Sequence, residues 1–159
     1  NMIFYGDELG LRGLATKGNN TEGFIWDYSD RDDNRAYFIP NTFNTDSAIM
    51  PYNIQVNNGN SLYHFYRKLC WIRKQNDPLR EGTLVNVESG DKRLITFYRD
   101  LKSRRIFIIQ NISSTELTFD LEKLNPFNYS ILFTNSTNII SEHGTIKLSP
   151  YSTVIYQSK

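Results

Sequence analysis

The chain has 159 residues, of which 39% are hydrophobic and 22% charged, and its formal net charge is +1. This composition is typical of a globular protein, and the near-zero charge argues against a nucleic-acid partner. No run approaches the roughly 20 apolar residues that cross a bilayer, so we expect no membrane partner.

The first residues, 2–5, form a short apolar and β-prone run that Gly6 closes. A single strand cannot satisfy its own backbone donors and acceptors, and no nearby segment resembles a parallel partner. We therefore expect a strand at residues 2–5 that pairs with strands from outside the nearby sequence. We also expect that Asn1 is not the natural N-terminus of the protein.

Residues 6–59 are irregular and rich in Gly, Asn, Asp and Thr. This stretch is far longer than an ordinary structureless loop of about 12–15 residues, so we expect it to be functional or wrapped on a scaffold.

An amphipathic helix follows, in the sequence "NSLYHFYRKLCWIRKQNDP". We expect Asn60 or Ser61 to cap its first turn and Pro78 to end it. The single cysteine, Cys70, excludes an internal disulfide, and we expect it to be a small buried hydrophobe. The apolar residues recur at helical spacing and predict the buried face, which comprises Leu62, Phe65, Tyr66, Leu69 and Ile72.

After Pro78 the hydrophobic period falls to two and stays there. Short β-prone runs with no helix among them predict a small antiparallel β-sandwich, with a domain boundary near residues 78–82. The run at 104–112 predicts a central strand, because its Ile and Phe residues suit burial on both faces. The seven predicted strands lie within residues 82–88, 93–100, 104–113, 116–122, 129–135, 145–150 and 152–157.

Three motifs in order resemble the α-amylase superfamily of glycoside hydrolases. "IFYGDELG" resembles the eighth barrel strand and its exit, and "DRDDNR" resembles the element that follows in oligosaccharide α-glucosidases. "SLYHFYRKLCWIRKQNDPLREG" is similar to the closing helix of that barrel. The resemblance by motif covers about residues 2–90, and the β-rich tail corresponds in position to the family's C-terminal domain.

The resemblance implies a mostly β chain that contains the last βα unit of a TIM barrel, followed by a small C-terminal antiparallel β-sandwich. We expect residues 1–78 to be the barrel remnant and residues 79–159 to be the sandwich. The family's catalytic carboxylates would precede Asn1, so we assign no catalytic residue here and expect this chain alone to be inactive. The implied substrate of the intact parent is an α-glucan oligosaccharide of the starch type, cleaved with retention.

Asp7 and Glu8 are adjacent, and on an extended chain their side chains would point to opposite faces. A retaining pair needs two carboxyl groups about 5–5.5 Å apart. We therefore expect Asp7 or Glu8 to bond to loop amides or to a neighbouring Arg instead, and to brace the floor of the active site. Gly6 and Gly10 would permit backbone geometries that are closed to other residues.

For substrate binding we select Arg35, because a guanidinium fork can span two vicinal hydroxyls, with Asp32 as the companion acceptor. The alternative is that this stretch is a solvated charged loop. Trp26, Tyr28 and Tyr37 could stack on sugar rings, although core or loop-anchoring roles are the simpler interpretation. After Arg35 the chain departs from the glucosidase pattern Thr-Pro-Met-Gln-Trp, so no subsite specificity is implied.

No cofactor is indicated, and no metal site, because His64 and His143 lack ligands at suitable spacing. Localisation stays open, with the cytoplasm favoured. Asn-x-Ser/Thr sequons such as the one at Asn111 carry little weight in a chain so rich in these residues.

Two other functions stay open, a carbohydrate-binding β-domain and a structural domain that caps the barrel. A chain without its barrel would expose apolar surface, so we expect self-association through the N-terminal remnant.

Overall fold

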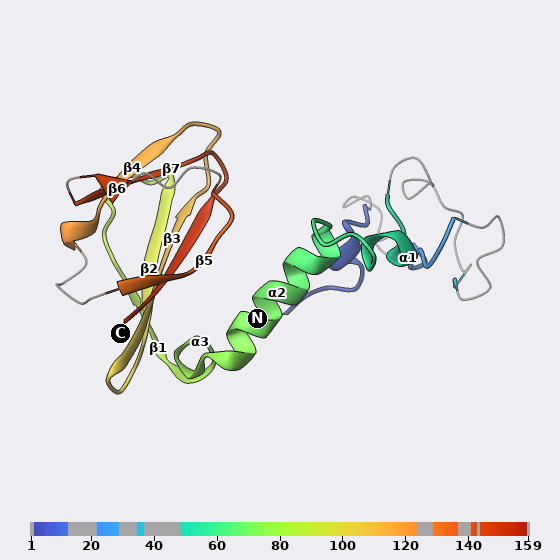
Figure 1. The fold of residues 1–159 in the computed structure, drawn as a ribbon, viewed down its shortest axis with the longest axis horizontal. Coiled ribbons are helices and arrows are strands. Elements are labelled where there is room, and N and C mark those ends of the chain that lie inside the picture. The colour runs from blue at the N-terminus through green and yellow to red at the C-terminus, as the bar shows by residue number, and fades with distance from the viewer. Residues whose placement is uncertain are drawn as a thin grey trace. The chain divides into compact units, whose positions relative to one another are not determined.

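The computed structural model describes residues 2–12, 22–28, 35–36, 49–123, 129–136, 141–142 and 144–158. Figure 1 shows the chain, which divides into two compact units, Asn1–Ile72 and Arg73–Lys159. The chain is mostly antiparallel β structure with few helices, as the sequence predicts.

All seven predicted strands form in the second unit, and its described residues include an eighth, very short strand. Two brief helices accompany the strands, α3 (Asp77–Glu81) and the 3-10 helix η2 (Leu121–Lys123). The strands are β1 (Thr83–Asn86), β2 (Leu94–Leu101), β3 (Arg104–Asn111), β4 (Leu117–Asp120), β5 (Tyr129–Thr134), β6 (Ser141–Glu142), β7 (Thr145–Leu148) and β8 (Thr153–Ser158).

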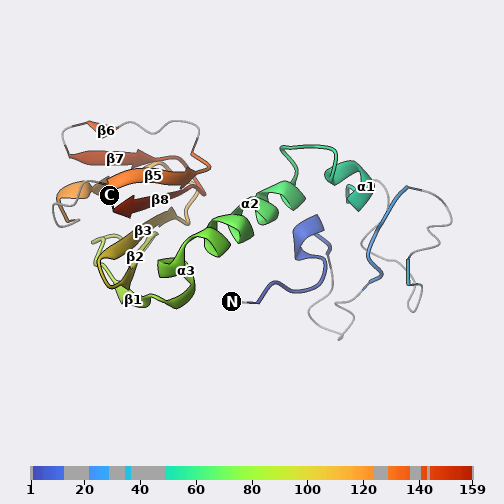
Figure 2. The same ribbon diagram turned by 60° about the horizontal axis from the view of Figure 1, so that its bottom comes forward.

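These strands form two antiparallel sheets, a larger one in the order β1-β2-β3-β8-β5 and a smaller one in the order β4-β7-β6. Figure 2 shows the layers from the side, with β6 and β7 in one and β1, β2 and β3 in the other. β3 lies in the middle of the larger sheet and its side chains at 106–109 are buried on both faces, which confirms the expected central strand.

One apolar cluster joins the two sheets. The rings of Phe107 on β3 and Phe119 on β4 lie 5.8 Å apart, which is a typical packing distance for aromatic pairs. Alternate residues face inward because successive side chains of a strand point to opposite faces. The nine buried members of the cluster are Leu94, Phe107, Ile109, Leu117, Phe119, Ile146, Leu148, Val154 and Tyr156.

The first unit is built from short helical pieces and loops. Its elements are η1 (Asp7–Leu9), α1 (Tyr52–Gln55) and α2 (Leu62–Gln75), whose last residues belong to the second unit. None of the described helices is both long and apolar enough to cross a membrane.

Helix α2 begins and ends where the sequence predicts. The Ser61 hydroxyl accepts a hydrogen bond from the His64 amide at 3.3 Å, so Ser61 is the cap. Asn76 then adopts an extended conformation, and the chain restarts as α3 with Pro78 in its first turn. Proline suits that position because it lacks the amide hydrogen that a first turn leaves unpaired.

Three local expectations for the first unit are wrong. Residues 2–5 do not pair as a strand, because the described part of Asn1–Ile72 offers them no ladder partner. Cys70 is exposed instead of buried. Of the predicted apolar face of α2, only Ile72 is buried, since the described residues leave the rest of that face without enough covering atoms.

Candidate functional site

A tight turn shapes the beginning of the first unit. Gly6 and Gly10 have φ values of 88° and 77°, and this left-handed conformation explains glycine at both positions. The Phe4 amide donates to Asp7 Oδ2 at 2.9 Å, so Asp7 stabilises this turn. Glu8 lies next on η1, where consecutive side chains diverge by about 120° because a 3-10 helix has three residues per turn.

The side chain of Gln55 joins three segments of this unit. Its Nε2 donates to the carbonyl oxygens of Leu9 at 3.1 Å and Met50 at 2.8 Å. Its Oε1 accepts from the Tyr63 amide at 3.0 Å. Gln55 is buried, so these bonds form away from water and hold η1, the 49–50 segment and the start of α2 together.

Residues 22–26 lie between the first turn and α1. The Phe24 amide donates to the Tyr5 hydroxyl at 2.5 Å, and the two rings lie 5.7 Å apart. The Tyr52 amide donates to Ile25 O at 2.9 Å, and the Asn53 amide donates to the Trp26 carbonyl at 3.0 Å. Residues 22–26 are therefore anchored on both sides.

Aromatic rings continue this anchoring toward α2. The Trp26 ring contacts Phe24 at 4.5 Å and Tyr52 at 5.5 Å between centroids. Tyr52 in turn meets Tyr63 edge-on at 5.3 Å. Trp26 thus anchors its loop, although 38% of its surface stays exposed, and Tyr28 is exposed nearby in sequence.

Arg35 and Ala36 pass directly against Gly23. A Cβ built on Gly23 would lie 2.2 Å from the Ala36 carbonyl oxygen and 3.0 Å from Arg35 Cγ. The backbone and the aliphatic part of the Arg35 side chain are therefore positioned by contact with Gly23, next to the anchored residues 22–26. Asp32 and Tyr37 lie outside the described residues, so the pairing of Arg35 with Asp32 stays a prediction.

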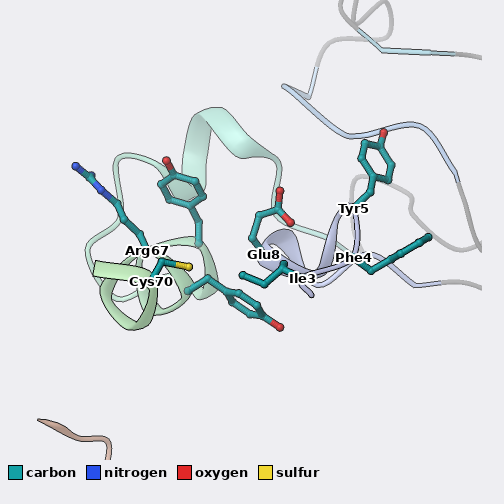
Figure 3. Close-up of a pocket in the computed structure, with 8 residues that line it drawn as sticks. Ile3, Phe4, Tyr5, Glu8, Arg67 and Cys70 are labelled. Atoms are coloured by element: carbon teal, nitrogen blue, oxygen red, sulfur yellow. The ribbon is translucent and has the colours of Figure 1, made fainter. Parts of the chain in front are cut away.

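A shallow pocket lies between the residues around η1 and helix α2. Figure 3 shows Ile3, Phe4, Tyr5 and Glu8 on one side, and Arg67 and Cys70 on α2. Tyr63 and Tyr66 also line the pocket. Among the described lining residues, Glu8 is the one that carries a carboxylate. A single carboxylate does not provide the pair that glycoside hydrolysis needs.

Hydrogen bonding to Tyr52, followed by burial, raises the pKa of Tyr63. Tyr63 is therefore a neutral phenol at physiological pH and contributes hydrogen bonding but no charge to this region.

No cluster of three potential metal-binding side chains occurs within the described part of the chain. His64 lies on α2 with Nε2 2.9 Å from the Val56 carbonyl oxygen. His64 is half-buried. His143 lies outside the described residues.

Sequence reasoning did not identify three residues that organise this region, Tyr5, Gly23 and Gln55. They stand in or beside the irregular stretch, where no hydrophobic period marks a position as buried. Glutamine is usually found on protein surfaces, so the residue type of Gln55 does not suggest burial. Its structural role is visible only from its hydrogen bonds to Leu9, Met50 and Tyr63.

Comparison with known proteins gives a consistent family. Residues 94–155 match the family described as the alpha-amylase SusG C-terminal domain. Alpha-amylase 3 of Dictyoglomus thermophilum is 27% identical over 97% of this chain, and the match spans 30% of that protein. Trehalose-6-phosphate hydrolase of Bacillus subtilis is 29% identical over 62% of this chain and 18% of its own length.

Solved structures show the same fold. The α-amylase from H. orenii has a TM-score of 0.82 and 21% identity over 99% of this chain and 32% of its own. Eubacterium rectale Amy13B has a TM-score of 0.75 and 20% identity over 98% of this chain and 30% of its own. The chain spans about a third of the length of these relatives, and it resembles the C-terminal part of α-amylases in sequence and in fold.

Proposed function

We propose that this chain is the C-terminal part of a retaining enzyme that hydrolyses α-glucosidic bonds in starch-type oligosaccharides. One observation carries the proposal: a single continuous match joins 97% of this chain, loops, helix and sandwich together, to 30% of an α-amylase. Residues 1–78 would then be the last βα unit of a TIM barrel, and residues 79–159 its C-terminal domain.

In this proposal the catalytic carboxylates belong to the rest of the protein. Asp7 accepts a hydrogen bond from the Phe4 amide, and Glu8 follows it on the 3-10 turn. Retaining hydrolysis needs two carboxyl groups about 5–5.5 Å apart across the scissile bond. Because neighbouring side chains diverge on a 3-10 turn, we do not expect Asp7 and Glu8 to form such a pair. The 159-residue chain would accordingly be inactive by itself.

Arg35 would contact the sugar, with Asp32 as the companion acceptor. Support comes from the chemistry of the guanidinium, which presents a planar fork of donors to neighbouring hydroxyls. The anchored segment beside it, 22–26, gives Arg35 a fixed starting point.

The test uses the full-length protein in which this chain occurs, with maltopentaose as substrate. We expect Arg35→Ala to raise KM about tenfold or more with kcat nearly unchanged, because a binding contact made equally in ground and transition state is lost. Arg104→Ala is the control, since this arginine is exposed on the sandwich. An unchanged KM for Arg35→Ala would contradict the proposed contact.

For the sandwich itself, a capping role is favoured over sugar binding. The rings of Phe107 and Phe119 are buried between the sheets and cannot stack on a sugar. Calorimetry of the chain with maltose and longer glucans should therefore give no binding heat from this unit. Tyr151 is the most exposed of the described tyrosines. A heat of binding that disappears in the Tyr151→Ala variant would favour a carbohydrate-binding module instead.

A further inference from the structure

The contact between Gly23 and residues 35–36 carries an inference beyond the sugar contact itself. The absence of a side chain at Gly23 allows the Ala36 carbonyl oxygen and the stem of Arg35 to pass over its α-carbon. An added Cβ would lie 2.2 Å from a backbone oxygen, and a backbone atom cannot swing away as the tip of a flexible side chain can. The 35–36 segment would have to move by about 1 Å to restore ordinary contact.

Gly23 itself cannot yield instead, because the residues that follow it are held. The Phe24 amide is bonded to the Tyr5 hydroxyl, and Ile25 is fully buried with its carbonyl bonded to the Tyr52 amide. Interiors of this kind are close-packed and resist displacement. An added Cβ at Gly23 would therefore displace Arg35 and Ala36. This segment can move because Ala36 is exposed.

We infer that Gly23 is a positioning residue for Arg35, and thereby sets the affinity of this site for an α-glucan. The inference rests on the proposed contact between Arg35 and sugar. Misplacement of a binding group by about 1 Å weakens its hydrogen bonds strongly, because they lose both distance and alignment.

The test compares Gly23→Ala with Gly59→Ala in the full-length protein, again with maltopentaose. Gly59 is the matched control, since a Cβ there would meet nothing within 4 Å. We expect Gly23→Ala to raise KM about tenfold with kcat little changed, and Gly59→Ala to behave as the parent protein. Thermal unfolding of both variants checks that the fold is kept.

A double-mutant cycle separates positioning from general damage. If Gly23 acts through Arg35, Gly23→Ala should add nothing to KM in an Arg35→Ala background. If Gly23→Ala does not fold, Ala36→Gly serves instead, because it loosens the same segment at an exposed position and should raise KM with the same dependence on Arg35.

The two failures are distinguishable. A raised KM for Arg35→Ala together with a normal or additive effect of Gly23→Ala would overturn the positioning role and leave the sugar contact standing. A normal KM for Arg35→Ala would overturn the contact and the positioning role together. Absence of any turnover by the full-length parent protein would refute the hydrolase proposal itself.

Discussion

Asn111 at the end of β3 links three parts of the sandwich through one buried side chain. Its Nδ2 donates to the Thr115 carbonyl at 2.7 Å, Ser149 O at 3.0 Å and Leu148 O at 3.2 Å. Its Oδ1 accepts from the Ser113 amide at 2.9 Å. The sequon at this position is thus closed to a glycan in the folded protein, since only 2% of Asn111 is exposed.

Removal of this side chain should be costly. Asn111→Ala leaves buried carbonyl groups without their donor, and we expect the free energy of unfolding of the sandwich to fall by about 2–3 kcal/mol. Urea unfolding measures the change. Asn86→Ala, at an exposed position on β1, is the control and should stay within about 0.5 kcal/mol of the parent. Equal effects of the two substitutions would contradict the assigned role.

Tyr156 on β8 gives the sandwich a dependence on alkaline pH. Burial raises the pKa of Tyr156 to about 12, whereas a tyrosine in an unfolded chain ionises at about 10. Because the unfolded state loses its proton first, stability is intact below pH 10 and falls as the pH rises from 10 toward 12.

Tyr156→Phe should remove that part of the alkaline loss, which is on the order of 2 kcal/mol by pH 12. Thermal unfolding at pH 8 and at pH 11.5 measures it, and the exposed Tyr151→Phe serves as the control. If Tyr156→Phe loses as much stability as the parent over this interval, ionisation of Tyr156 is not responsible.

At the scale of elements, strands were predictable and the first unit was not. β2, β3 and β8 each alternate apolar and polar residues or run apolar through the sheet centre, and such patterns depend only on the strand itself. β6 has two residues and no pattern to detect. The strand expected at 2–5 failed for another reason, because pairing needs a partner that a local pattern cannot supply.

Helix α2 illustrates the same limit for burial. Its period correctly predicts a helix, and Ser61 and Pro78 mark its ends. The period does not show what covers the apolar face, and Cys70 and Leu62 are exposed. In the candidate site, Arg35 was selected from its chemistry and the family resemblance, whereas the anchors Gln55 and Gly23 became visible only through their contacts.

The apolar surface around η1 and α2 should cause self-association of the 159-residue chain. Met2 and Trp71 are 87% and 60% exposed, and Ile3 and Phe4 are about half exposed in the same unit. Exposed apolar surface of this kind favours association in water. Light scattering as a function of concentration should show oligomers.

Ile3→Asp should reduce this association, because it places a charge in the patch. Ile112→Asp is the matched control, since Ile112 is exposed to 52% and Ile3 to 50%, but Ile112 belongs to the sandwich. A strict monomer at all concentrations, or equal effects of the two substitutions, would contradict the prediction.

At the scale of the whole molecule, the two compact units are held together internally in different ways. Residues 73–159 have a core of their own, whereas the described part of residues 1–72 is held by a few polar anchors and an aromatic cluster. The sequence resemblance predicts a barrel remnant at residues 1–78 and a sandwich at 79–159, because its motifs cover the barrel's last elements and none of the expected catalytic strands.

The most direct test measures sugar release from maltopentaose by the purified 159-residue chain beside the full-length protein. We predict steady turnover by the full-length protein and none by the chain, because in the proposed function the chain would contribute binding and support without the carboxylate pair. Sustained turnover by the chain that disappears in Glu8→Gln would contradict this, since it would place the chemistry in the pocket between η1 and α2.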